Sequence, residues 1–207
     1  MNKILVLFAH PSYQKSVLHK SLNQQYIGLS HITFHDLYEE YPNFIIDIEK
    51  EQELLKSHDI VIFQHPLYWY SSPALIKEWI DVVFQHGFAY GAEGRALKNK
   101  TCVSVVTTGA DPVSYLNNNS IRNVMQPIER TVKFCNMNYL PPFVIHGGLK
   151  IKSDHTESSL ANEMLETQVM LYKSFLKDLT HSEINHENLD SYNTVNEWYI
   201  QSGVHHD

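Results

Sequence analysis

The sequence predicts an α/β fold: a doubly wound, five-stranded parallel sheet with helices on both faces. Short apolar runs alternate with amphipathic helical segments along the chain, which is typical of β-α-β units joined by right-handed crossovers. The apolar runs are nearly continuous, as expected of strands that are buried on both faces. With 207 residues, the chain is long enough for one substantial domain and too short for two comfortable ones.

The first half of the chain supplies three strands and two helices. Lys3–Ala9 (KILVLFA) is a short apolar run and predicts the first strand. Ser16–Ile27 has apolar residues at helical spacing, and its first residue is a suitable N-cap. Ile32–Leu37 predicts the second strand, and Asp47–Ser57 a helix with an acidic start. Asp59–Gln64 (DIVIFQ) is a third buried strand.

The second half continues the alternation. Pro73–His86 predicts a strong helix, because proline is tolerated in the first turn and a broad apolar face follows. Thr101–Thr107 (TCVSVVT) predicts the fourth strand and Ile121–Cys135 the next helix. Tyr139–Ile145 completes the sheet, and Glu157–Leu179 predicts a long C-terminal helix. We therefore expect one ligand-binding domain over residues 1–180.

Residues 181–207 form a polar C-terminal tail in this prediction. The tail ends in a small aromatic cluster, Trp198-Tyr199-Ile200. Such a cluster favours docking on a partner subunit over fraying, by a small margin.

The composition excludes several functional classes. The formal net charge is -7, which argues against a broad nucleic-acid surface built from lysine and arginine. No apolar run approaches the roughly 18 residues of a membrane helix, and the one at the N-terminus stops at His10-Pro11. Cys102 and Cys135 form neither a disulfide framework nor a metal motif. Two buried thiols in a reducing cytoplasm are the simplest interpretation of the cysteines, so we expect a cytoplasmic location. The thirteen histidines show no convergent spacing, so we expect no metal ion.

In doubly wound sheets, ligands bind outside the carboxyl ends of the strands. The loop after the first strand runs from His10 to Ser16 and enters a helix. Free N–H groups at the helix start, including those of Val17 and Leu18, could hold a phosphate together with the side chains of His10 and Ser16. A plain turn with a capping serine explains the loop slightly better when it is taken alone. Neither GxGxxG nor GxxxxGK[ST] is present.

The loop after the third strand, residues 65–73, places three adjacent aromatic residues between Pro66 and Pro73. Tyr68, Trp69 and Tyr70 cannot all point inward, so they favour contact with a planar ring over filling of the core.

The loop after the fourth strand contains Thr107, Thr108, Gly109 and Ala110, with Tyr115 shortly after. The glycine allows close approach of a ligand, and the hydroxyl groups suit the pyrimidine oxygens of a flavin. Tyr115 has an equally good explanation as a packing residue.

Several stretches together resemble the flavodoxin-like NAD(P)H:quinone dehydrogenase family, which includes DT-diaphorase, and within it the bacterial ancillary oxidoreductases of glutathione-gated potassium efflux. They are LVLFAHP, DIVIFQHPLYWYSSPALIKEWIDVVF, HGFAYG, VVTTG and NYLPPFVIHG. The resemblance implies a homodimer with flavin at the subunit interface and hydride transfer from NAD(P)H through flavin to a quinone. It also implies that the HGFAYG segment helps to build the partner's pocket.

The resemblance also implies the flavin contacts residue by residue. The phosphate and ribityl chain would meet His10, Ser16, Val17, Leu18 and His19. The isoalloxazine would lie along Pro66, Leu67, Tyr68 and Trp69, with Thr107, Thr108, Gly109 and Ala110 at its pyrimidine end. Tyr115 matches the family's active-site tyrosine. FMN is favoured over FAD as the cofactor.

Two departures from the family pattern bear on function. Ala110 stands where the family usually has a second glycine, and residues 117–121 (NNNSI) lack the catalytic histidine that follows the tyrosine in relatives. Asn119 would replace that histidine only as a neutral donor. A quinone oxidoreductase is the leading hypothesis. The alternative is a flavin-binding regulatory subunit of a potassium efflux antiporter, peripheral at the inner face of the membrane, and a flavodoxin-type electron carrier is a third.

Overall fold

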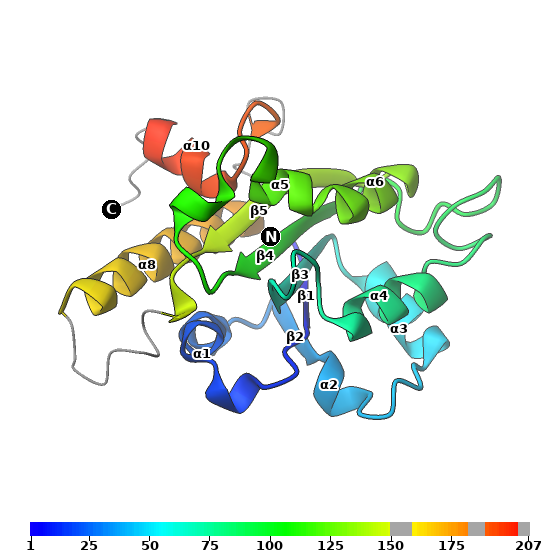
Figure 1. The fold of residues 1–207 in the computed structure, drawn as a ribbon. Coiled ribbons are helices and arrows are strands. Elements are labelled where there is room, and N and C mark those ends of the chain that lie inside the picture. The colour runs from blue at the N-terminus through cyan, green and yellow to red at the C-terminus, as the bar shows by residue number, and fades with distance from the viewer. Residues whose placement is uncertain (150–158, 182–188, 203–207) are drawn as a thin grey trace.

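The computed structural model describes residues 1–149, 159–181 and 189–202, and it confirms the predicted fold. All neighbouring strands are parallel, and their order in the sheet is β2-β1-β3-β4-β5 (Figure 1). The strands are β1 (Ile4–Phe8), β2 (Ile32–Asp36), β3 (Ile60–Pro66), β4 (Thr101–Thr107) and β5 (Asn138–Ile145).

Helices cover both faces of this sheet (Figure 1). One face carries α2 (Leu37–Glu40), α3 (Ile48–Ser57), α4 (Ala74–Val83), α5 (Ile121–Val124) and α6 (Gln126–Phe134). The other face carries α1 (Val17–Asn23), α8 (Ser159–His181) and α10 (Val195–Ser202). Short 3-10 turns lie in the connections: η1 (Tyr13–Lys15), η2 (Gln24–Tyr26), η3 (Pro112–Tyr115) and η4 (Asn117–Asn119).

Alternate residues of each central strand enter separate hydrophobic cores. In β3, Val61 and Phe63 face the core under α3 to α6, whereas Ile60 and Ile62 face the core under α1, α8 and α10. Successive side chains of a strand point to opposite faces. A strand between two helical layers must therefore be apolar at every position, which explains its continuous apolar sequence.

A buried carboxylate fastens the first of these layers. The Glu51 side chain is fully buried and accepts hydrogen bonds from Tyr41 Oη at 2.5 Å and Trp79 Nε1 at 2.8 Å. His35 Nε2 lies 2.8 Å from the same carboxylate. Burial raises the pKa of Glu51, but the hydrogen bonds from His35, Tyr41 and Trp79 outweigh it and leave the pKa below its usual value. Glu51 thus joins α3 to β2 and α4 as a paired anion.

The predicted helix over Ile121–Cys135 is two helices, because α5 ends at Val124 and α6 begins at Gln126. Pro127 explains the break: it has no N–H to donate, and its ring clashes with the preceding turn. A second irregularity lies in β5, where Pro141 and Pro142 fall at a register shift against β4 between Val103 and Val105. Proline cannot complete a ladder and occurs in edge strands or at bulges.

The C-terminal segment packs on its own chain, which corrects the expectation of docking on a partner subunit. Val195 and Tyr199 of α10 are buried against the core that α8 and β5 share. Asn196 accepts from the Val144 N–H at 2.8 Å and donates to the Val144 carbonyl at 2.9 Å. Arg122 of α5 donates to the carbonyls of Asp190 and Tyr192 at 2.6 and 2.8 Å. Strand β5 and helix α8 of the same chain provide the surface on which Val195 and Tyr199 are buried.

Candidate functional site

The loop after β1 is organised around two histidines. His10 is buried, and its Nδ1 accepts the N–H of Ser12 at 3.0 Å, so in the neutral ring the proton lies on Nε2. Ser16 caps α1 by accepting the N–H of His19 at 3.3 Å. Val17 and Leu18 occupy the first turn, where backbone N–H groups lack intrahelical partners. Contact of His10, Ser16, Val17 and Leu18 with a phosphate stays a prediction.

His19 lies deeper than expected for a ligand contact. Its side chain is fully buried, with Nε2 2.9 Å from Thr107 Oγ1 and Nδ1 3.2 Å from Gln64 Nε2. Burial, followed by the nearby His10 and His65, lowers the pKa of His19 well below its usual value. A neutral ring with both nitrogens engaged supports the loop from beneath. Direct contact of His19 with a cofactor stays a prediction.

The loop after β3 is a tight hairpin with an exposed aromatic tip. The backbones of Tyr68 and Ser71 exchange two hydrogen bonds of 3.0 Å. Trp69 and Tyr70, between them, have backbone φ angles of 48° and 60°. Residues other than glycine adopt such positive φ angles at a cost of about 1–2 kcal/mol per residue. Trp69 is 95% exposed and Tyr70 67% exposed. A strained turn that presents large apolar rings to solvent points to binding rather than packing.

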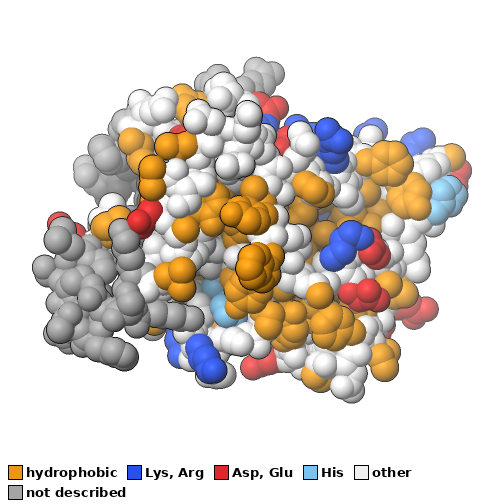
Figure 2. All heavy atoms as spheres, in the orientation of Figure 1, with side chains coloured by type: hydrophobic (Ala, Val, Ile, Leu, Met, Phe, Trp, Pro, Cys, Tyr) orange, Lys and Arg blue, Asp and Glu red, His pale blue; other side chains and the backbone are white. Residues whose placement is uncertain are grey.

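The base of this hairpin joins the third loop. Leu67 N–H donates to the Thr107 carbonyl at 2.8 Å, so Pro66 and Leu67 lie beside the end of β4. Hydrophobic side chains gather across the middle of this face of the molecule, near where Figure 1 places the β3–α4 connection (Figure 2). The predicted aromatic and threonine loops are therefore neighbours at one edge of the sheet.

The loop after β4 is held by the segment that follows β5. Gly147 N–H donates to the Ala110 carbonyl at 3.2 Å, and Gly148 N–H donates to the Thr108 carbonyl at 2.9 Å. A Cβ at Gly109 would lie 2.9 Å from Leu149 Cγ, so a side chain there would displace Leu149. Thr107 and Thr108 are almost completely buried. The Leu149 side chain packs on Gly109, and the absence of a Cβ at Gly109 makes room for it.

Sequence reasoning missed His146, which the fold brings beside Tyr115. The two rings lie 5.7 Å apart at 35°, and His146 Nδ1 is 2.9 Å from Thr108 Oγ1. Burial lowers the pKa of His146 to about 4. Burial also raises the pKa of Tyr115, and the nearby Tyr70 adds to this effect. The adjacency of β4 and β5 in the predicted fold was the signal that could have paired their carboxyl ends.

Another buried histidine lies at the end of β3. His65 Nδ1 donates to the Pro66 carbonyl at 2.9 Å, and its buried Nε2 has no partner in the part of the chain that the structure describes. Burial lowers its pKa to about 4, so the ring is neutral. Within residues 1–149, 159–181 and 189–202, no group of three His, Cys, Asp or Glu side chains is arranged for a metal ion.

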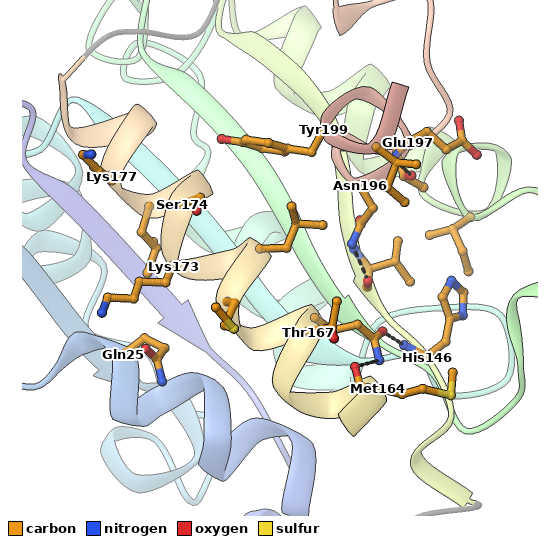
Figure 3. Close-up of a pocket in the computed structure, with 18 of the residues that line it drawn as sticks. Gln25, His146, Met164, Thr167, Lys173, Ser174, Lys177, Asn196, Glu197 and Tyr199 are labelled. Atoms are coloured by element: carbon orange, nitrogen blue, oxygen red, sulfur yellow. Dashed lines mark hydrogen bonds between the residues drawn. The ribbon is translucent and has the colours of Figure 1, made fainter. Parts of the chain in front are cut away.

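The large cavity of the structure lies next to this edge rather than inside it. It measures about 1700 Å³ and runs along α8 and α10 (Figure 3). Tyr115 and His146 line one end, but none of the residues predicted for cofactor binding in the three loops takes part. A flavin held by the three loops would therefore lie outside this cavity.

The residues at the edge fit a flavin. Trp69 and Tyr70 offer exposed rings for a planar heterocycle, and the start of α1 with Ser16 suits its phosphate. The donors at this edge are neutral, as a pyrimidine ring requires, but the hydroxyl groups of Thr107 and Thr108 are buried and hydrogen-bonded within the chain.

Comparison with known proteins settles the family. The flavodoxin-like fold family matches residues 2–169. The glutathione-regulated potassium-efflux system ancillary protein KefG of Serratia proteamaculans is 44% identical over 160 residues, which cover 75% of this chain and 87% of the relative. The chain belongs to the flavodoxin-like NAD(P)H:quinone oxidoreductase family.

Two solved structures of this family set the scale of the likeness. The general stress protein 14 of Treponema denticola, in complex with FMN, is 34% identical with a TM-score of 0.76, over 86% of this chain and 99% of that one. An NADPH-quinone reductase from P. pentosaceus is 30% identical with a TM-score of 0.66, over 81% of this chain and 95% of that one. In both comparisons the match covers nearly the whole length of the solved structure.

Two further findings concern the surroundings of the site. The HGFAYG segment, residues 86–91, follows α4, which returns from the carboxyl edge to the opposite end of the sheet (Figure 1). It is therefore remote from Tyr115 of the same chain, and any contribution to a pocket would be made to a second copy. None of the helices described is long and apolar enough to cross a membrane.

Proposed function

We propose that this protein is a flavin-binding ancillary protein that associates with a potassium-efflux antiporter. The observation that carries the proposal is the 44% identity to KefG over most of both chains. An ancillary protein must bind its antiporter through protein surface, because no described helix spans a membrane. Such an association would place the protein in the cytoplasm, at the inner face of the membrane.

The cofactor that we propose is FMN. Support comes from the fit of the three loops and from the FMN complex of a relative that is 34% identical. His10, Ser16 and the first turn of α1 would hold the phosphate. The hairpin from Pro66 to Trp69 and the segment Thr107–Ala110 would hold the ring. Bound flavin supplies two-electron hydride chemistry, and the chain's residues bind it and exclude water.

Co-expression tests the association. The tagged protein is produced with the potassium-efflux antiporter of its own organism, and with an unrelated membrane transporter as the control. We expect the antiporter alone to co-purify, and potassium efflux from cells to rise when the protein is present. Failure to co-purify together with unchanged efflux would show that the ancillary proposal is wrong.

A second activity of the same protein is supported by the cluster of Tyr115, Thr108 and His146 at the edge. We propose that the protein also transfers hydride from NAD(P)H, through flavin, to a quinone. The flavin absorption bands should bleach on anaerobic addition of NADPH and return on addition of a soluble quinone. Tyr115→Phe should slow this cycle without loss of bound flavin. Bands that never bleach would leave a regulatory flavoprotein.

We also propose a homodimer, in which a second copy covers the open aromatic edge. Trp69 and Tyr70 make this edge apolar, and the HGFAYG segment can reach a site only in another copy. Sedimentation equilibrium of the flavin-loaded protein should give twice the chain mass of 24.0 kDa. A monomer at every concentration would contradict it.

A further inference from the structure

We propose that His146 Nε2 holds the proton that balances the negative charge created when the site is reduced. Thr108 fixes the ring from its other nitrogen, and Tyr115 completes the cluster. This inference rests on the flavin-dependent reductase activity proposed above, and it assigns a role to a residue that lies outside the three cofactor loops.

The hydrogen bonds of the cluster decide which nitrogen is available. Thr108 Oγ1 has a single hydrogen, which it donates to the Ala110 carbonyl at 2.8 Å. His146 Nδ1 lies 2.9 Å from that oxygen, and this hydrogen bond can run in either direction. We assign the hydrogen to Nδ1, because His146 also hydrogen-bonds the Ala110 carbonyl, which can only accept. In a neutral imidazole with a hydrogen on Nδ1, Nε2 carries the lone pair. Nε2 is thus the atom that can gain a proton.

The surroundings keep the ring neutral before reduction. Burial holds the pKa of His146 at about 4, while the Ala110 carbonyl and the Asp111 carboxylate act in the opposite direction. Tyr115 is the titratable group that packs on the ring from η3. From α8 the contact is the neutral Gln168. The cluster therefore consists of the Asp111 carboxyl group, the Tyr115 phenol and the His146 imidazole, which is uncharged at neutral pH.

The position of His146 is fixed from two helices. Its backbone N–H donates to Gln168 Oε1 of α8 at 2.9 Å, and Asn196 of α10 holds Val144 two residues earlier (Figure 3). A proton acceptor that is already in place needs no rearrangement when charge develops beside it. The side chain also lines the large cavity, through which water can deliver a proton.

The electron and proton balance requires such an acceptor. A dihydronicotinamide delivers a hydride, which is two electrons and one proton, and leaves the site with one added negative charge. A proton from water then binds His146 Nε2. The quinone later removes two electrons and two protons, the second of them from Nε2, and the ring returns to neutral. A unit negative charge about 4 Å away raises the pKa of an imidazole by about three units in surroundings of intermediate polarity.

Histidine NMR of the flavin-loaded full-length protein tests this directly. His146→Asn keeps a donor near Thr108 without a titrating ring, and its spectrum identifies the His146 signal. His181→Asn is the matched control, because His181 is exposed at the end of α8 and hydrogen-bonds the Lys177 carbonyl of its own helix. It lines the same cavity, so the control also shows whether loss of any histidine from the lining has an effect. We expect the His146 ring to be neutral at pH 7 in oxidised protein and about half protonated at the same pH after anaerobic reduction with NADPH.

Proton uptake and kinetics complete the test. In a weakly buffered solution with a pH indicator, the native protein should take up a proton from solvent on reduction, and His146→Asn should take up less. Transfer to quinone should fall about 100-fold in His146→Asn, while flavin content and the His181→Asn variant stay unchanged. A His146 ring that stays neutral on reduction, or unchanged proton uptake in His146→Asn, would overturn the inference while the reductase activity stands. Failure to bind flavin would overturn both.

Discussion

At the scale of single residues, the aromatic hairpin shows function working against stability. Trp69 and Tyr70 hold the backbone of a type I′ turn, for which Asn-Gly is the preferred pair. Their exposed rings recover none of the strain through packing in the single chain. We conclude that these residues are present for a partner or ligand and not for the fold.

The double variant Trp69→Asn/Tyr70→Gly should therefore fold more stably, by about 1–2 kcal/mol, and bind flavin more weakly. Urea unfolding of cofactor-free protein and a flavin titration measure the two effects. The control is Ile45→Asn, which removes another exposed apolar side chain outside the three loops. Tighter flavin binding in the double variant would refute this account.

Glu51 makes stability depend on pH. Its pKa is below the usual value in the folded chain, so its contribution is complete above the unfolded carboxyl pKa of about 4.3 and is lost as pH falls below it. Glu51→Gln should cost about 2–4 kcal/mol at pH 7.

The difference between native protein and Glu51→Gln should shrink as pH falls from 5 to 3. Denaturant midpoints across this range measure it, with the exposed Glu53→Gln as control. A difference that is constant with pH would mean that the carboxylate charge is not what stabilises the cluster.

At the scale of elements, α10 stabilises β5 through one amide. Asn196→Ala leaves the N–H and carbonyl of Val144 without their partner, and should cost about 1–3 kcal/mol. Gln201→Ala, in an exposed position of the same helix, should cost little. Thermal unfolding compares them, and equal melting temperatures would show that water replaces the amide at no cost.

Helices and strands were predicted correctly where the spacing of apolar residues followed a single clear pattern. Four of the five strands were found because two-sided burial leaves an apolar run, as in Ile60–Phe63, whereas the edge strand β2 is only partly buried. The break at Pro127 was missed because the apolar pattern continues across it. Tail docking was misjudged because Trp198-Tyr199-Ile200 shows that a surface will be buried but not which surface.

The candidate site was predictable only in part, for a related reason. Loops after β1, β3 and β4 could be brought to one edge from topology alone. The adjacency of β4 and β5 could have placed His146 near the loop after β4, but its contact with Tyr115 also depends on how the chain after β5 folds back over Ala110. Contacts between loops produce no regular spacing of residues that could be recognised in the sequence.

At the scale of the whole molecule, the division at residue 180 stays a prediction, and a truncated chain tests it. Removal of residues 182–207 uncovers the surface that buries Leu189, Val195 and Tyr199. Three such side chains contribute about 5 kcal/mol together, a large share of the stability of an ordinary domain. We expect a much lower denaturant midpoint. An unchanged midpoint would show that residues 1–181 fold independently.

The edge position of β5 has one more consequence. A strand at the margin of a sheet offers unpaired N–H and carbonyl groups, to which a strand of another molecule can add and so start aggregation. In β5, Pro141 and Pro142 remove two donors, and the Asn196 amide occupies both polar groups of Val144. The C-terminal helix α10 thus blocks the addition of a foreign strand at Val144.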